Sequence, residues 1–139
     1  RLVGSEMCIR DSDYMSYRSL SSEAEIKAAL IELNKICRGE AFITLGEKGC
    51  AFLKSGMLQI VPSWLCNAVD TTGAGDVFHG AFTYGVHYSW HIDNIILFAS
   101  LTAAISIEKK GVRESMPDLA VVHHSLNSYE RNLKHYFEE

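Results

Sequence analysis

The sequence predicts an α/β fold, and three observations taken in chain order support this class. A helix with its own capping signal comes first, short apolar runs rich in β-forming residues follow, and three helical patterns end the chain. This order is typical of the end of a layered domain in which helices cover a sheet. With 139 residues, the chain is long enough to bury one such core.

The first helix is predicted over residues 22–37. Ser22 and Glu25 have the spacing of a capping box, in which each side chain bonds the backbone N–H of the other residue. Apolar residues then recur at helical spacing until Arg38-Gly39 ends the helix. The apolar residues are Ile26, Ala29, Leu30, Leu33 and Ile36.

Three strands are predicted next. The turn Gly46–Gly49 separates the first strand from the second, and Ser55-Gly56 separates the second from the third. Pro62 then ends the hairpin, because proline cannot donate a ladder hydrogen bond. The predicted strands cover residues 41–45, 50–53 and 58–61.

Three further helices follow a loop. The first begins directly after a glycine-rich turn, the second is rich in alanine and is ended by Gly111, and Pro117-Asp118 opens the third. The third helix carries one apolar stripe, which predicts that a single face is buried. The predicted helices cover about residues 74–88, 92–109 and 117–136.

The composition is that of an ordinary globular protein, with 47% hydrophobic and 22% charged residues. The net charge of −4 and the lack of a basic stripe argue against a nucleic-acid partner. The longest apolar run, residues 92–107, is too short and too polar for a membrane span. We therefore expect a cytoplasmic protein with reduced, mostly buried thiols. Its cysteines are Cys8, Cys37, Cys50 and Cys66.

Residues 1–12 fit poorly with the pattern that follows them. The chain begins with Arg1 and shows no charged segment followed by an apolar one, so no signal peptide is visible. The stretch is similar to those at the ends of translated sequence fragments. We expect residues 1–12 to be non-native or disordered, residues 13–139 to form the folded part, and the whole to be a piece of a longer protein.

The most informative motif is the run Asp70-Thr71-Thr72-Gly73-Ala74-Gly75-Asp76, directly before a predicted helix. A glycine turn that opens a helix presents unpaired backbone N–H groups at the positive end of the helix dipole. This arrangement holds an anion, most often a phosphate. Asp76 could serve only as a helix cap. Next to a bound phosphate, it could instead accept a proton from an attacking hydroxyl.

Three segments resemble motifs of the ribokinase/PfkB family of carbohydrate kinases, in the family's order. The resemblance implies a Rossmann-like α/β/α sandwich with a small β lid, of which this chain is the C-terminal, nucleotide-binding part. It also implies transfer of the ATP γ-phosphate to a hydroxyl of a sugar or a related alcohol. The matching segments are Ile43–Gly49, Asp70–Gly80, and Ala103–Ile107 with Gly111, Ser115 and Pro117.

The resemblance assigns roles to individual residues. Asp76 is implied as the general base, and the backbone N–H groups of Gly73, Ala74 and Gly75 as the anion hole. Fixed N–H dipoles suit the charge on the equatorial oxygens of a transferring phosphoryl group. Nucleotide-binding roles are implied for Thr44, Gly46, Gly49, Ala103, Ser106 and Gly111.

Cofactors and partners also follow from the resemblance. ATP and Mg²⁺ are implied, together with a sugar-like acceptor and, in many members, a monovalent cation such as K⁺. The cation's ligands here would include Asp70, Thr72 and Ser115. A homodimer of the longer protein is compatible with the family.

The chain departs from the family in length. The lid, most sugar contacts and an early Gly-Gly segment belong to an N-terminal half that is missing, so we expect little or no kinase activity from the fragment alone. Two alternatives stay open, namely a nucleoside or sugar-phosphate kinase of the same fold, or a non-catalytic nucleotide-binding module. Residues 44–49 could also be only a hairpin turn.

Overall fold

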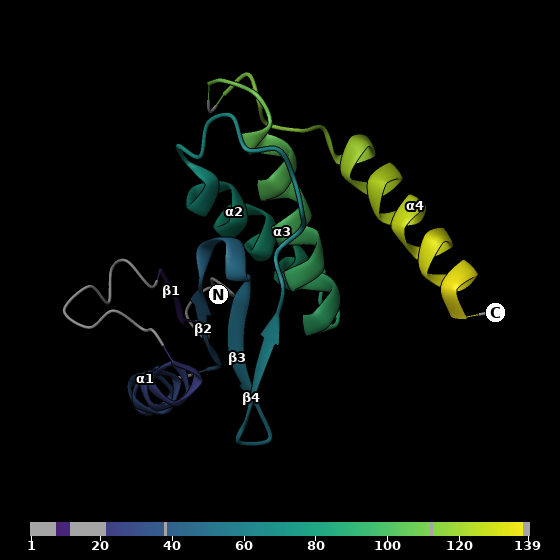
Figure 1. Ribbon diagram of the computed structural model, residues 1–139. Helices are drawn as coiled ribbons and strands as arrows, with labels where there is room; N and C mark the ends of the chain where they lie inside the picture. Colours follow the sequence, from purple (N-terminus) through teal and green to yellow (C-terminus); the bar gives the residue numbers. More distant parts are fainter. Residues whose placement is uncertain (1–7, 12–21, 38, 112, 138–139) are drawn as a thin grey trace.

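The computed structural model describes residues 8–11, 22–37, 39–111 and 113–137. Its strands are β1 (Cys8–Asp11), β2 (Ala41–Thr44), β3 (Cys50–Lys54) and β4 (Met57–Val61). Its helices are α1 (Glu23–Ile36), the short 3₁₀ helix η2 (Gly46–Lys48), α2 (Ala74–His87), α3 (Ile92–Ile107) and α4 (Leu119–Phe137). The strands form one sheet in the order β1-β2-β3-β4 (Figure 1). β1 runs parallel to β2, and the other neighbours are antiparallel.

β1 differs from the expectation that residues 1–12 lie outside the fold. Its four residues pair with β2 in one register, from Cys8 opposite Ala41 to Asp11 opposite Thr44. A strand this short has little periodicity of its own, and its partner follows only after α1, so local patterns do not reveal the pairing. The remainder of residues 1–12 lies outside the described residues.

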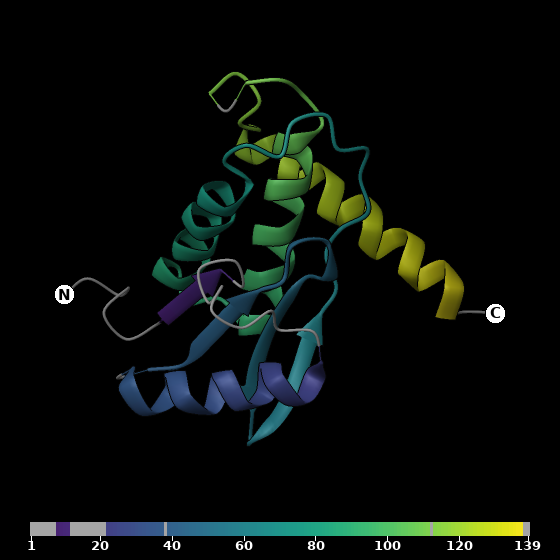
Figure 2. The same cartoon turned by 60° about the vertical axis from the view of Figure 1, so that its left-hand side comes forward.

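Helices cover both faces of the sheet, which gives three layers. Along β2, Ala41 and Ile43 pack in one buried cluster with α1, whereas Phe42 packs in another with α2 and α3. This division follows from the alternation of side chains along a strand. Figure 2 shows α1 in front of the sheet, with α2 and α3 on the opposite side. α4 leads away from these layers, with Val122 buried near its start.

The predicted elements are confirmed with shifts of a few residues at their ends. The Ser22 Oγ accepts from the Glu25 N–H at 3.3 Å, and the Glu25 carboxylate accepts from the Ser22 N–H at 3.1 Å. This capping box fixes the start of α1. α3 ends at Ile107, two residues earlier than predicted. None of the helices in the described ranges is long and apolar enough to cross a bilayer.

An aromatic cluster fixes α2 on the sheet. The ring of Phe82 lies 4.9 Å from that of Phe42 and 6.0 Å from that of Phe78, measured between centroids. Trp64 and Trp90 are partly buried and pack against the same core. Because α2 is held along its buried face, the turn at its N-terminus has a defined position.

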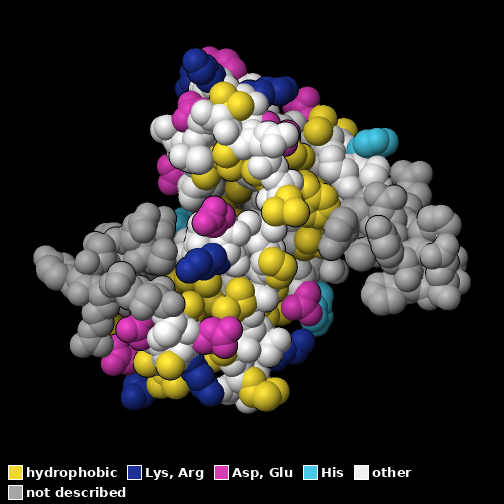
Figure 3. All heavy atoms as spheres, in the orientation of Figure 1, with side chains coloured by type: hydrophobic (Ala, Val, Ile, Leu, Met, Phe, Trp, Pro, Cys, Tyr) yellow, Lys and Arg dark blue, Asp and Glu magenta, His cyan; other side chains and the backbone are white. Residues whose placement is uncertain are grey.

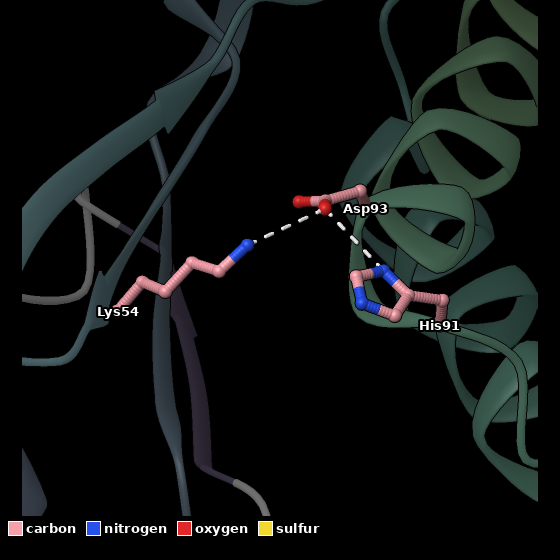
Figure 4. A network of polar contacts seen from close by, with 3 residues as sticks. All are labelled: Lys54, His91 and Asp93. Carbon is pink, nitrogen blue, oxygen red and sulfur yellow. Dashed lines mark ion pairs between the residues drawn. The ribbon is translucent and has the colours of Figure 1, made fainter.

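A second contact joins the hairpin to the start of α3 (Figure 4). The Asp93 Oδ2 lies 3.8 Å from the Lys54 Nζ and 3.3 Å from the His91 Nδ1. All three side chains are more than half exposed, so the contact contributes little to stability. It lies at the opposite end of α3 from the loop that approaches Asp70.

Candidate active site

The turn before α2 adopts the conformation that its glycines allow. Gly73 is the N-cap residue and has a φ of 77°, in the left-handed region that favours glycine. The Ala74 N–H donates to the Thr71 carbonyl at 3.2 Å, and the Val77 N–H donates to the Gly73 carbonyl at 3.0 Å. These two bonds close the turn and start the helix.

The turn leaves backbone donors free at the helix N-terminus. Within the described ranges, the N–H groups of Gly73, Gly75 and Asp76 have no hydrogen-bond acceptor. Ala74, predicted as an anion-hole donor with Gly73 and Gly75, has its N–H committed to the turn. The structure therefore offers Asp76 as a backbone donor that the motif alone did not single out. Free donors at the positive end of a helix are suited to an anion.

Asp76 lies in the first turn of α2 and is exposed. It is not the N-cap residue, which is Gly73, and the cap has no side-chain hydrogen bond. The interpretation of Asp76 as a simple helix cap is therefore wrong. The helix dipole favours the ionised carboxylate at this position. Asp76 thus carries a carboxylate on the same turn as the free N–H groups.

Asp70 joins two loops that are distant in sequence. Its carboxylate accepts from the Thr72 N–H at 3.0 Å and from the Gly111 N–H at 3.3 Å. The N–H groups of Val69 and Asp70 both donate to the Ile107 carbonyl, at 2.7 and 3.1 Å. The hydrogen bonds from Thr72 and then Gly111, with the nearby charge of Lys110, lower the pKa of Asp70. The ionised carboxylate therefore ties the turn before α2 to the loop after α3.

The end of α3 and the loop after it contribute small, buried polar residues to this region. Ser106 is buried, and its hydroxyl donates to the Ala103 carbonyl at 2.7 Å. Ser115 is also buried, and its N–H donates to the Gly111 carbonyl at 3.1 Å. Asp70, Gly111 and Ser115 are therefore linked through successive contacts, although they are far apart in the sequence.

The turn Gly46–Gly49 is tied to the same region by one loop. Gly49 has a φ of 103°, and a Cβ there would overlap the Val61 carbonyl oxygen, so the tight turn requires glycine. The Ser63 hydroxyl donates to the Glu47 carbonyl. The Trp64 N–H then donates to the Ser100 hydroxyl at 3.1 Å. The loop 62–70 is thus attached to the turn at its start, to the middle of α3, and to the end of α3.

A groove that the motifs did not predict lies beside this loop, between α3 and α4. It has a volume of about 330 Å³, and Trp64, Cys66, Ala104, Glu108 and His124 are among its lining residues. Burial, followed by the charge of Glu108, raises the pKa of Cys66. The thiol therefore stays protonated and weakly nucleophilic at neutral pH. No local periodicity could reveal this groove, because three separate segments form it.

The described cysteines agree with the expectation of reduced thiols. Cys37, Cys50 and Cys66 form no disulfide bond, and burial raises the pKa of Cys50 to about 12. His79, one turn beyond Asp76, packs against Phe78 with 6.3 Å between ring centroids. Its Nε2 is buried and has no hydrogen-bond partner among the described residues.

The chain thus combines a layered α/β fold with a glycine turn that leaves N–H groups free at a helix N-terminus and an exposed carboxylate on the same turn. The model of the pfkB family of carbohydrate kinases matches residues 9–119. The chain therefore belongs to the pfkB family, and the expected ribokinase-like fold is confirmed.

Individual relatives agree with this assignment. The chain is 38% identical over 105 residues to ribokinase from Lactococcus lactis, covering 76% of this chain and 35% of that protein. It is 35% identical over 94 residues to deoxyribokinase from Salmonella typhi, covering 68% and 31%. The chain thus spans about a third of the length of the curated relatives that it matches.

Solved structures show the same fold. Arabidopsis thaliana ribokinase complexed with ribose and ATP superimposes with a TM-score of 0.78 at 25% identity, over 86% of this chain and 40% of that one. Escherichia coli phosphofructokinase-2 in complex with potassium gives a TM-score of 0.67 at 20% identity, over 78% and 36%. The second likeness concerns the fold alone.

Proposed function

We propose that this chain is the nucleotide-binding part of an ATP-dependent kinase that phosphorylates a hydroxyl of a sugar or a related alcohol. The observation that carries the proposal is the turn at the start of α2. It combines free N–H groups at Gly73, Gly75 and Asp76 with an exposed carboxylate on Asp76. An anion site and a base on one helical turn are the two elements that phosphoryl transfer needs from the protein.

The proposed reaction uses these groups in a single step. The acceptor hydroxyl oxygen attacks the γ-phosphorus, the bond from that phosphorus to the ADP oxygen breaks, and the hydroxyl proton passes to the Asp76 carboxylate. The free N–H groups stabilise the negative charge on the transferring phosphoryl oxygens. Because the turn is already closed by the Ala74 and Val77 bonds, these donors need little rearrangement.

The nucleotide is proposed to lie along the loop 62–70. The predicted nucleotide-binding residues fall at both ends of the region that this loop connects. Thr44, Gly46 and Gly49 belong to the turn at one end, while Ala103, Ser106 and Gly111 belong to α3 and its following loop at the other. The attachments at Glu47, Ser100 and Ile107 fix the separation of these two groups before the nucleotide binds.

The residues fit a monovalent cation better than a protein-bound magnesium ion. Asp70, Gly111 and Ser115 are joined by successive hydrogen bonds, and each carboxylate oxygen keeps a lone pair beyond its N–H bond. They would hold the cation together with Thr72. No cluster of three His, Cys, Asp or Glu side chains in the described ranges could hold a metal. Magnesium would therefore be held chiefly by phosphate oxygens, whose charge it partly neutralises.

We infer the class of acceptor from the names of the relatives. Ribokinase and deoxyribokinase are sugar kinases by name, and the ribokinase structure with ribose and ATP pairs a sugar with the nucleotide. A nucleoside-like acceptor is the second candidate, because an aminoimidazole riboside kinase shares the fold with a TM-score of 0.71. A cytoplasmic location and a homodimer of the longer protein belong to the same proposal.

The test is Asp76→Asn in the longer protein, because this substitution removes the base and keeps the side-chain shape. Turnover should fall by about a hundredfold or more, while ATP affinity changes little. Asp93→Asn is a matched control, since Asp93 is an exposed acid in the first turn of α3, at the other end of the helix pair. Unchanged turnover in Asp76→Asn would favour a non-catalytic nucleotide-binding module.

A further inference from the structure

We propose that the Lys110 side chain binds the polyphosphate of the nucleotide and supplements the backbone donors of the anion-binding turn. This assignment rests on the proposed function, and it concerns a residue of the loop after α3 rather than the turn itself. The assignment is based on three observations: the position at which the loop is bonded to Asp70, the exposed positive charge of Lys110, and the negative charge of a nucleotide.

The loop after α3 is held against the turn before α2. The Gly111 N–H donates to the Asp70 carboxylate at 3.3 Å, and Asp70 also accepts from Thr72, the residue before Gly73. Lys110 directly precedes Gly111, so its backbone is next to the bond between Gly111 and Asp70. Figures 1 and 2 both show the two loops side by side at the same end of the molecule. Lys110 is therefore anchored through its neighbour next to the anion-binding turn.

Lys110 is exposed, and its ammonium group forms no close ion pair among the described residues. In the part of the chain that the structure describes, no carboxylate lies within ion-pair distance of Lys110, Lys109 or Arg113. Figure 3 shows basic and acidic side chains gathered at this end of the molecule. Two acids lie in the same part of the chain, and neither forms an ion pair with Lys110. Glu108 lines the groove beside Cys66, and the Glu114 carboxylate lies against Gly111.

The polyphosphate of a nucleotide needs more positive charge than the turn provides. A triphosphate carries several negative charges, whereas free N–H groups at a helix end act as about half of one positive charge. Kinases and related enzymes commonly place a lysine beside the phosphates for this reason. Lys110 lies beside the residue that contacts Asp70, so it is the described lysine whose backbone is tied most directly to the turn.

A simpler role for Lys110 would be to neutralise Asp70, whose pKa it helps to lower. That role is structural, and it would act through the position of the two loops. Its loss would lower the melting temperature and would affect every ligand of the site alike. A phosphate-binding role would instead weaken only ligands that carry phosphates. The number of phosphates on the ligand therefore separates the two roles.

The experiment measures binding to the 139-residue chain by titration calorimetry at low ionic strength, with ATP, inorganic triphosphate and adenosine as probes. The variants are Lys110→Gln, Lys110→Arg and the matched neighbour Lys109→Gln, each checked by thermal unfolding. We expect Lys110→Gln to weaken ATP and triphosphate binding by about fivefold or more. Adenosine binding and the melting temperature should stay unchanged, Lys110→Arg should retain most affinity, and Lys109→Gln should have a smaller effect.

Three results would overturn the assignment. Equal losses in Lys109→Gln and Lys110→Gln would indicate a diffuse field rather than a contact. An equal loss of adenosine affinity, or a lower melting temperature, would indicate the structural role. If the unchanged chain binds neither ATP nor triphosphate saturably, the proposed nucleotide-binding function of this chain fails and the lysine assignment falls with it. That failure appears before any variant is compared, so the two failures are distinguishable.

Discussion

Three glycines of one helical segment provide a test of how the turn that we propose to bind an anion is built. Gly73 caps α2 with a φ of 77°, whereas Gly80 lies within α2 with nothing within 4 Å of a Cβ position. Gly85 also lies within α2, but a Cβ there would lie 2.9 Å from Ile95. The same substitution, glycine to alanine, should therefore have a different result at each position.

The magnitudes follow from the local geometry. At Gly73, the left-handed conformation costs alanine about 1–2 kcal/mol relative to glycine. Alanine also makes the unfolded chain less flexible, which offsets about 0.4–1 kcal/mol of this cost. At Gly80, alanine should raise the free energy of unfolding by about 0.5–1 kcal/mol, as in other helix interiors. At Gly85, overpacking against Ile95 should lower it by about 1–3 kcal/mol. For a chain of this size, 1 kcal/mol corresponds to about 3–5 °C in melting temperature.

The assay is thermal unfolding followed by circular dichroism, with ATP titration of the same variants. We expect Gly80→Ala to melt higher than the unchanged chain and Gly73→Ala to melt lower. Gly73→Ala should also bind ATP more weakly, because the change in φ re-aims the N–H groups of Gly75 and Asp76. If Gly73→Ala and Gly80→Ala shift the melting temperature in the same direction, Gly73 does not adopt the left-handed conformation and the reasoning is refuted.

Two further predictions concern titrating groups at the site. Because burial and the charge of Glu108 raise the pKa of Cys66, its alkylation by iodoacetamide should be slow near neutral pH and rise at alkaline pH, with Glu108→Gln shifting the profile to lower pH. Mass spectrometry of the Cys66 peptide measures this rate, and an unshifted profile in Glu108→Gln would contradict the cause. Because the pKa of Asp70 is lowered from 3.8, its stabilisation is present above that value and is lost as the pH falls through the folded value. The melting-temperature difference between the unchanged chain and Asp70→Asn should therefore shrink in acid, and a difference that is independent of pH would contradict the assignment.

Much of the fold could be predicted because its signals are local. The capping box of Ser22 and Glu25 lies within one helical turn, and the strands and helices follow from short-range periodicity. The glycine turn at the start of α2 could be located in the same way, since Gly73 and Asp76 belong to one continuous motif. These features need no knowledge of what lies elsewhere in the chain.

The remaining features depend on contacts between distant residues. The bond from Gly111 to Asp70 spans 41 residues, so the sequence could name both residues without showing that they touch. The groove beside Cys66 needs α4 to lie against α3, which no motif encodes. The hydrogen bond from the Ala74 N–H to the Thr71 carbonyl depends on the backbone conformation of the turn. The residue types limit this conformation but do not determine it.

The loop 62–70 contains neither helix nor strand, yet its course is attached at Ser63, Trp64 and Val69. Such a segment works as a spacer of set length, because its ends cannot separate without breaking one of these bonds. One added residue would displace either the Gly46–Gly49 turn or Asp70. The hairpin tip at Ser55-Gly56 is exposed and can absorb the same insertion locally. Changes in chain length should therefore be accepted at that tip and rejected in the spacer.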